Sequence, residues 1–119
     1  MKGYRVVKRY LDTGEYTGLY NLWPETWDGS VQAGVRHFSR ILDRAISVDC
    51  GAGVHFFTVR KAAEEAMEIL KSKWYTLEMW EIETIGDVVR PIMNKPGAGW
   101  NERKARAEGV QYKKLLKCR

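Results

Sequence analysis

Histidine and glutamate side chains are the groups in this chain that could carry proton-transfer chemistry. His55 lies inside the apolar run Val54–Val59. Imidazole titrates near neutrality, so His55 could serve in a pocket, although a histidine in a strand can also be a packed, hydrogen-bonded residue. Glu81 and Glu83 are two residues apart, so in a strand they would face the same side. They could act as paired carboxylates or simply face solvent.

Two Gly-Ala-Gly triplets offer a different chemistry, because backbone N–H groups can hold a phosphate. The triplets are Gly51–Gly53 and Gly97–Gly99. Neither fits a P-loop, and only the first stands beside an expected strand followed by a helix. Turns explain both more simply. No metal site is expected, because His37 and His55 are far apart with no CxxC or HxxxH beside them.

The positive charge is concentrated at the two ends of the chain. Residues 1–100 contain 13 basic and 13 acidic residues, whereas residues 101–119 contain seven basic and two acidic ones, so the net charge of +5 lies in this C-terminal segment. A second basic cluster opens the chain. We expect the C-terminal segment to bind nucleic acid or an acidic protein surface. The residues expected to make this contact are Arg103, Lys104, Arg106, Lys113, Lys114 and Lys117.

The same charges have an alternative explanation. If Lys2, Arg5, Lys8 and Arg9 form a strand beside the C-terminal one, the molecule has a single basic edge. A charged edge also prevents strands of different molecules from pairing. The five tryptophans likewise could stack on nucleobases beside basic residues or pack in the core.

Length and composition indicate one globular domain over residues 1–119. The chain is 45% hydrophobic and 29% charged, which excludes disordered and fibrous classes. No apolar run approaches the roughly 18–20 residues of a membrane helix, and the N-terminus lacks a signal peptide's apolar stretch. Cys50 and Cys118 are expected to be reduced thiols, the alternative being a bridge between them. These features favour the cytoplasm.

Hydrophobic periodicity predicts strands and a first helix. Alternation predicts strands at Tyr4–Leu11 and Trp74–Thr84, and the apolar run between glycines predicts a buried strand at Val54–Val59. Apolar residues at spacings of three and four predict a helix over Val31–Ile46, with Ser30 as its N-cap.

A second helix is predicted directly after the strand Val54–Val59, with Thr58 as its N-cap. The segment GDVVRPIM (86–93) predicts a short strand that Pro91 ends. Lys104–Leu116 predicts either one strand broken at Gly109 or a short helix followed by a strand. The expected fold class is therefore α+β, a mainly antiparallel sheet packed against two helices. The apolar face of the second helix would consist of Val59, Ala62, Ala63, Ala66, Ile69 and Leu70.

The stretch GAGVHFFTVRKAAEEA, from Gly51, resembles a segment of ADP-ribosyltransferase folds. In those folds a glycine-flanked aromatic strand enters a helix beside the nicotinamide pocket. The stretch also resembles small phage and viral proteins of unknown role, which carry a GIHFF strand, a helix and a Y-x-L-E-V strand, matched here by Tyr75–Glu83. The resemblance covers Gly51 to Glu83.

The transferase resemblance implies a site for NAD. It places His55 and Tyr4 along the NAD cleft and gives Glu83, in an E-x-E pair with Glu81, the role of polarising the ribose. Arg5 would be the first-strand arginine, and the cofactor would also contact Gly51 and Gly53. Ala63 and Ala66 stand where the family has a serine and a tyrosine that bind nicotinamide, and no S-T-S strand is present.

Two functions are therefore expected from the sequence. The first is a noncatalytic interaction protein without a cofactor, of phage or viral type, that binds nucleic acid or an acidic protein surface. The alternative is an NAD-binding enzyme similar to mono-ADP-ribosyltransferases.

Overall fold

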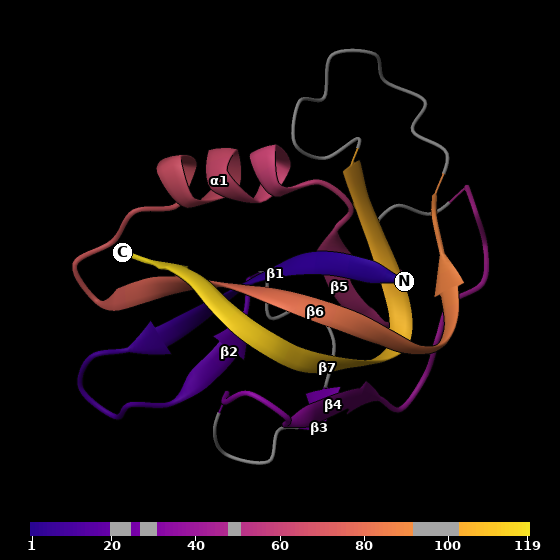
Figure 1. Ribbon diagram of the computed structural model, residues 1–119, viewed down its shortest axis with the longest axis horizontal. Helices are drawn as coiled ribbons and strands as arrows, with labels where there is room; N and C mark the ends of the chain where they lie inside the picture. Colours follow the sequence, from indigo (N-terminus) through magenta and orange to yellow (C-terminus); the bar gives the residue numbers. More distant parts are fainter. Residues whose placement is uncertain (20–24, 27–30, 48–50, 92–102) are drawn as a thin grey trace.

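A computed structural model shows a seven-stranded antiparallel sheet and one α-helix in the part of the chain that it describes, residues 1–19, 25–26, 31–47, 51–91 and 103–119 (Figure 1). The sheet order is β2-β1-β5-β7-β4-β3, and β6 pairs with both β1 and β7. The strands are β1 (Lys2–Tyr10), β2 (Tyr16–Gly18), β3 (Glu25–Thr26), β4 (Arg36–Ser39), β5 (Val54–Phe57), β6 (Tyr75–Val89) and β7 (Lys104–Cys118), and the helix is α1 (Arg60–Ile69).

Four of these strands close into a ring. β6 pairs along β1 on one side and along β7 on the other, and β5 bridges the opposite sides of β1 and β7. Register shifts between β6 and β7 allow these two long strands to bend around the ring. The closure buries strand edges and gives the sheet an inside and an outside.

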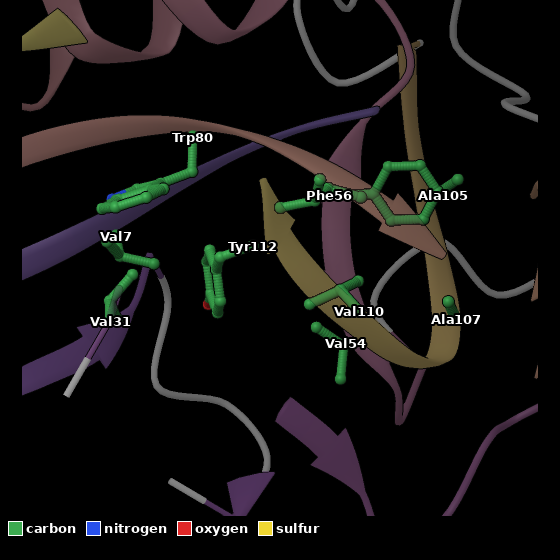
Figure 2. Packing of buried hydrophobic residues seen from close by; sticks show 10 residues of the cluster. Val7, Val31, Val54, Phe56, Trp80, Ala105, Ala107, Val110 and Tyr112 are labelled. Carbon is green, nitrogen blue, oxygen red and sulfur yellow. The ribbon is translucent and has the colours of Figure 1, made fainter. Parts of the chain in front are cut away.

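The inside of the ring is filled by alternate residues of its strands, which form one apolar cluster. Tyr112 lies at the centre, with Val7, Val31 and Trp80 to one side and Val110 to the other (Figure 2). Val54 and Phe56 of β5 belong to the same cluster, as the alternation of that strand predicts.

A second apolar cluster lies between α1 and the outside of the sheet. It joins Phe57 of β5 with Val6, Leu77 and Met79 of the β1–β6 pair. α1 begins at Arg60, where Val59 is its N-cap without a side-chain hydrogen bond. The helix is amphipathic and buries the small side chains of Ala62, Ala63 and Ala66 together with Met67. The three alanines confirm the predicted apolar face, whereas Val59 and Ile69 are exposed.

The prediction of an α+β fold with two helices is wrong, because the structure is mostly β and residues 31–47 contain strand β4 in place of a helix. The backbone of this segment bonds to β7: the N–H of Gly34 donates to the carbonyl of Tyr112, whose own N–H donates to the carbonyl of Val35. Gly34 has a φ of 93°, which a helix does not accommodate. The predicted N-cap, Ser30, lies outside the described residues.

Three local predictions also change. Thr58 does not cap α1, because both its N–H and its hydroxyl donate to the carbonyl of Arg103. The predicted strand Trp74–Thr84 is confirmed from Tyr75 onward and continues to Val89, so the first four residues of the short strand expected at 86–93 are the end of β6, and residues 92–93 lie outside the described ranges. β7 is one continuous strand through Gly109.

The length and apolarity of a helical segment decide whether it could cross a membrane. None of the helical residues described here forms a segment that is both long and apolar enough to cross a bilayer.

Candidate nucleic-acid interface

The side chain of His55 is fixed by a hydrogen bond to the backbone. Its Nε2 donates to the carbonyl of Gly51 at 2.7 Å, because a carbonyl can only accept. Burial lowers the pKa of His55 to about 4, and the positive charges of Lys104, Arg5 and Arg106 act in the same direction. His55 is therefore neutral at pH 7 and bonded to the backbone.

Arg5 lies on the inside of the ring and is 2% exposed. Its Nε donates to the carbonyl of His55 at 3.1 Å, and its Nη1 donates to the hydroxyl of Tyr112 at 2.5 Å. That hydroxyl lies 2.9 Å from Nδ1 of His37, which is fully buried. The predicted first-strand arginine thus belongs to a polar network within the core.

Gly51 and Gly53 make room for a buried arginine. A Cβ on Gly51 would lie 3.0 Å from Cζ of Arg106, and a Cβ on Gly53 would lie 3.0 Å from Cβ of Arg106. Gly53 also has a φ of 149°, which L-residues rarely adopt. Close packing against Asp43 and Arg106 therefore explains the glycine at position 51, and close packing against Arg106 and Leu42 explains the glycine at position 53.

Tyr4 and Glu83 lie apart from this network. Tyr4 packs against the apolar cluster under α1, on the opposite side of β1 from Arg5. Glu83 is exposed, and a hydrogen bond from the N-terminal ammonium holds the pKa of its carboxyl below the usual value. Glu81 pairs with Lys2 at 2.9 Å. The structure therefore spreads the residues expected around NAD over both sides of the sheet.

The pH dependence of stability should report the neutral state of His55. The native pKa is about 4 and the ordinary value is 6.5, so between these values the unfolded chain binds more protons. The free energy of unfolding should fall by on the order of 2–3 kcal/mol between about pH 7 and pH 4. His55→Gln cannot titrate and should lack this part of the loss. Denaturant titrations of both proteins across this pH range measure the difference in the free energy of unfolding. If that free energy falls equally for the two proteins as the pH is lowered, the prediction is contradicted.

The six basic residues predicted to contact a partner do not form one surface. Lys104 and Arg106 are 9% and 0% exposed, so they cannot contribute to an interface without unfolding. Lys113 and Lys114 are exposed and Lys117 is half-buried. Arg103 is exposed at the other end of β7.

The basic N-terminal and C-terminal strands are also not direct neighbours on the β6 side of the ring. β6 lies between β1 and β7, and its Glu81 stands opposite both Tyr4 and Lys114. Glu81 is already paired with Lys2. The acidic strand therefore offsets part of the basic charge on both sides of it.

A different group of basic residues does come together, where β1 ends and β6 begins. Tyr10 of the sequence Lys8-Arg9-Tyr10 is the register partner of Tyr75 of Lys73-Trp74-Tyr75, so the two antiparallel tripeptides meet at this pair and extend from it in opposite directions (Figure 1, left of the view). The N–H of Leu11 continues this pairing by donating to the carbonyl of Trp74 at 3.0 Å. We call these six residues, 8–10 and 73–75, the aromatic–basic end.

Cations lie over aromatic rings throughout the aromatic–basic end. Nζ of Lys8 is 4.9 Å from the ring centre of Tyr75, and Nζ of Lys73 is 5.1 Å from that of Trp74. Arg9, on the other side of β1, lies 5.8 Å from the ring of Tyr16 in β2. These contacts are attractive because the ring face is electron-rich, and they hold positive charge beside the rings.

The rings differ in how firmly they are held. Tyr75 packs edge-on against Tyr10, with ring centres 5.7 Å apart, and its hydroxyl donates to the carbonyl of Leu70 at the end of α1. Trp74 is 67% exposed, and Leu11 beside it is 62% exposed. In contrast, Trp80 is buried in the core. Trp74 therefore presents a large ring to solvent beside the cation of Lys73, whereas the ring of Tyr75 is fixed and lies under the cation of Lys8.

The sequence contains a signal for this site, namely basic residues next to aromatic ones, which a count of charges does not detect. Both tripeptides place basic residues next to aromatic ones, at the end of one predicted strand and the start of another. Only the register between these strands, which are more than 60 residues apart in the chain, brings the tripeptides together.

Other binding chemistries are less apparent. Within the described ranges, no three His, Cys, Asp or Glu side chains gather in a way that could hold a metal ion. Cys118 is a free, exposed thiol, and Cys50 lies outside those ranges. Comparison of the chain with protein-family models, with curated proteins and with solved structures gave no match.

Proposed function

We propose that this protein binds single-stranded nucleic acid through the aromatic–basic end and catalyses no reaction there. The observation that carries the proposal is the exposed ring of Trp74 with the cation of Lys73 over it, next to the Tyr10–Tyr75 pair, where Lys8 lies over Tyr75. Proteins that bind single strands combine cationic side chains with rings on which bases stack, and this end of the molecule provides both.

The rings and the charges would have separate roles. A base can stack on Trp74, because two-thirds of that side chain is open to solvent. Lys73 would contact a phosphate next to the stacked base, and Lys8 and Arg9, on the two sides of β1, would contact phosphates farther along the strand. Tyr75 is fixed by its hydrogen bond to Leu70 and by Tyr10, so it supports the site without having to move.

A single strand suits this end better than the two other polyanions considered. Bases in a duplex are stacked on one another and leave their faces inaccessible to Trp74. An acidic protein surface would use the lysines but would leave the exposed ring without a flat partner. Lys113 and Lys114 can add long-range attraction, although Glu81 and Glu83 of the neighbouring strand offset it.

Salt dependence provides the first test. If three cations contact phosphates, the slope of log K against log salt concentration should be about −2 for a single strand, measured by fluorescence anisotropy with labelled oligo(dT) between about 50 and 200 mM salt. Lys61→Glu, a charge reversal on the exposed face of α1, is the matched control and should leave the slope unchanged. Absence of oligonucleotide binding at the lowest salt concentration would contradict the proposal.

A further inference from the structure

A second concave site lies far from the aromatic–basic end, where β4 meets the bend of β6. The pocket has a volume of about 340 Å³ and is lined by Phe38, Arg40, Leu42 and Ile85, among others, with Glu108 on its wall. This volume is at the lower end of the range for small-molecule sites, and the lining combines apolar and cationic groups. The pocket is therefore suited to a small ligand with a flat apolar part and a negative charge.

The ring of Phe38 provides a flat apolar surface. Phe38 is opposite Gly109 in register, and a Cβ on Gly109 would lie 2.5 Å from Cδ1 of Phe38. The ring therefore rests directly on the backbone of β7, and glycine is what allows it to do so. Phe38 is nevertheless 42% exposed and forms part of the pocket lining.

Arginines flank this ring along β4. Arg36 and Phe38 share the side of the strand opposite to the buried His37, and residues two apart in a strand are about 6–7 Å apart. Arg40 lies just past the end of β4 and lines the pocket. Neither Arg36 nor Arg40 forms an ion pair with any residue in the described ranges, and both are exposed.

Arg44 has a different role in the pocket. Its guanidinium contacts Asp87 at 2.5 Å and Glu108 at 3.4 Å, which ties the segment after β4 to the bend of β6. Glu108 also accepts a hydrogen bond from the N–H of Asp87 at 2.7 Å. These contacts fix the pocket wall and offset part of the charge of its two carboxylates, so Arg40 is the lining cation left to meet an anionic ligand.

From this arrangement we infer that the pocket binds one nucleotide unit. The base stacks on Phe38 beside Leu42 and Ile85, and the phosphate is bound by Arg40, with Arg36 nearby. The unit can be a free mononucleotide or a nucleotide within a bound strand, since the chemistry is the same. The pocket shares no residue with the aromatic–basic end, so this inference does not depend on the proposed function.

The test compares AMP with its two halves, adenosine and ribose 5-phosphate, by isothermal titration calorimetry. AMP should bind about tenfold or more tightly than either half, because it uses both the ring and the arginine. Phe38→Ala should reduce AMP to the affinity of ribose 5-phosphate, and Arg40→Glu should reduce it to that of adenosine or below, because the new carboxylate also repels the phosphate. Arg90→Glu is the matched control, an exposed arginine outside the pocket lining, and should bind AMP like the wild type.

Competition then separates the two sources of the nucleotide. A 5′-phosphorylated oligo(dT) that displaces AMP assigns the pocket to a bound strand, and one that binds without displacing AMP assigns it to the free nucleotide. Trp74→Ala should leave AMP affinity unchanged, which distinguishes this pocket from the aromatic–basic end. The inference is overturned if the correctly folded Phe38→Ala and Arg40→Glu proteins bind AMP like the wild type, or if the wild type does not bind AMP.

Discussion

Replacing Arg106 with alanine should lower the free energy of unfolding by about 3–5 kcal/mol, the largest effect expected for any single substitution in this chain. Arg106 is fully buried, and its Nε and Nη2 donate to the carbonyls of Asp43 and Ala45, each at 2.7 Å. Alanine would leave a cavity and remove the donors from both carbonyls. The segment between β4 and β5 would then lose two of its hydrogen bonds to β7.

Urea denaturation followed by circular dichroism measures this effect. Arg103→Ala provides the control, because Arg103 is exposed and only its carbonyl bonds to Thr58, so the side chain can be removed at little cost. A loss of less than about 1 kcal/mol for Arg106→Ala would be the cost of an ordinary surface change and would contradict a structural role.

Replacing Trp74 with alanine should weaken binding of a single-stranded oligonucleotide by about tenfold, because stacking one base on one ring contributes about 1–3 kcal/mol. Lys73→Glu should also weaken binding, because it reverses a charge beside the same ring. It should make the dependence of binding on salt concentration less steep. Neither change should affect stability much, because both side chains are exposed.

The controls for this effect come from other exposed positions. Ile69→Ala removes a similarly exposed apolar side chain from the end of α1, and Lys61→Glu reverses a charge elsewhere on that helix. Both should bind oligonucleotide as the wild type does. If Ile69→Ala weakened binding as much as Trp74→Ala, the ring of Trp74 would have no special role.

The sequence predicted the local structure well where the pattern of one element was unambiguous. Val54–Phe57 alternates between the two apolar clusters as expected, and Ala62, Ala63 and Ala66 are buried as expected. It failed at Val31–Ile46, where apolar residues at helical spacing form a short strand and a loop. There the outcome depends on hydrogen bonds to β7, more than 70 residues away, which outweigh a local periodicity.

The candidate site was less predictable than the fold. Charge counting selected Lys104 and Arg106, but the packing of Gly51 and Gly53 over β7 buries Arg106. The same counting could not place Lys8 beside Tyr75, because their proximity depends on the long-range pairing of β1 with β6. Composition located the positive charge along the chain, whereas only the register of the strands shows which charges lie beside exposed rings.

The most direct test of single-strand binding is competition between three polyanions for one labelled oligo(dT). Unlabelled oligo(dT), a duplex of the same length and polyglutamate of matched charge would be compared at one salt concentration. If bases stack on Trp74, the single strand should compete at least tenfold better than the other two, and Trp74→Ala should remove most of that preference. Equal competition by all three, unchanged in Trp74→Ala, would contradict single-strand recognition and leave only a general attraction to negative charge.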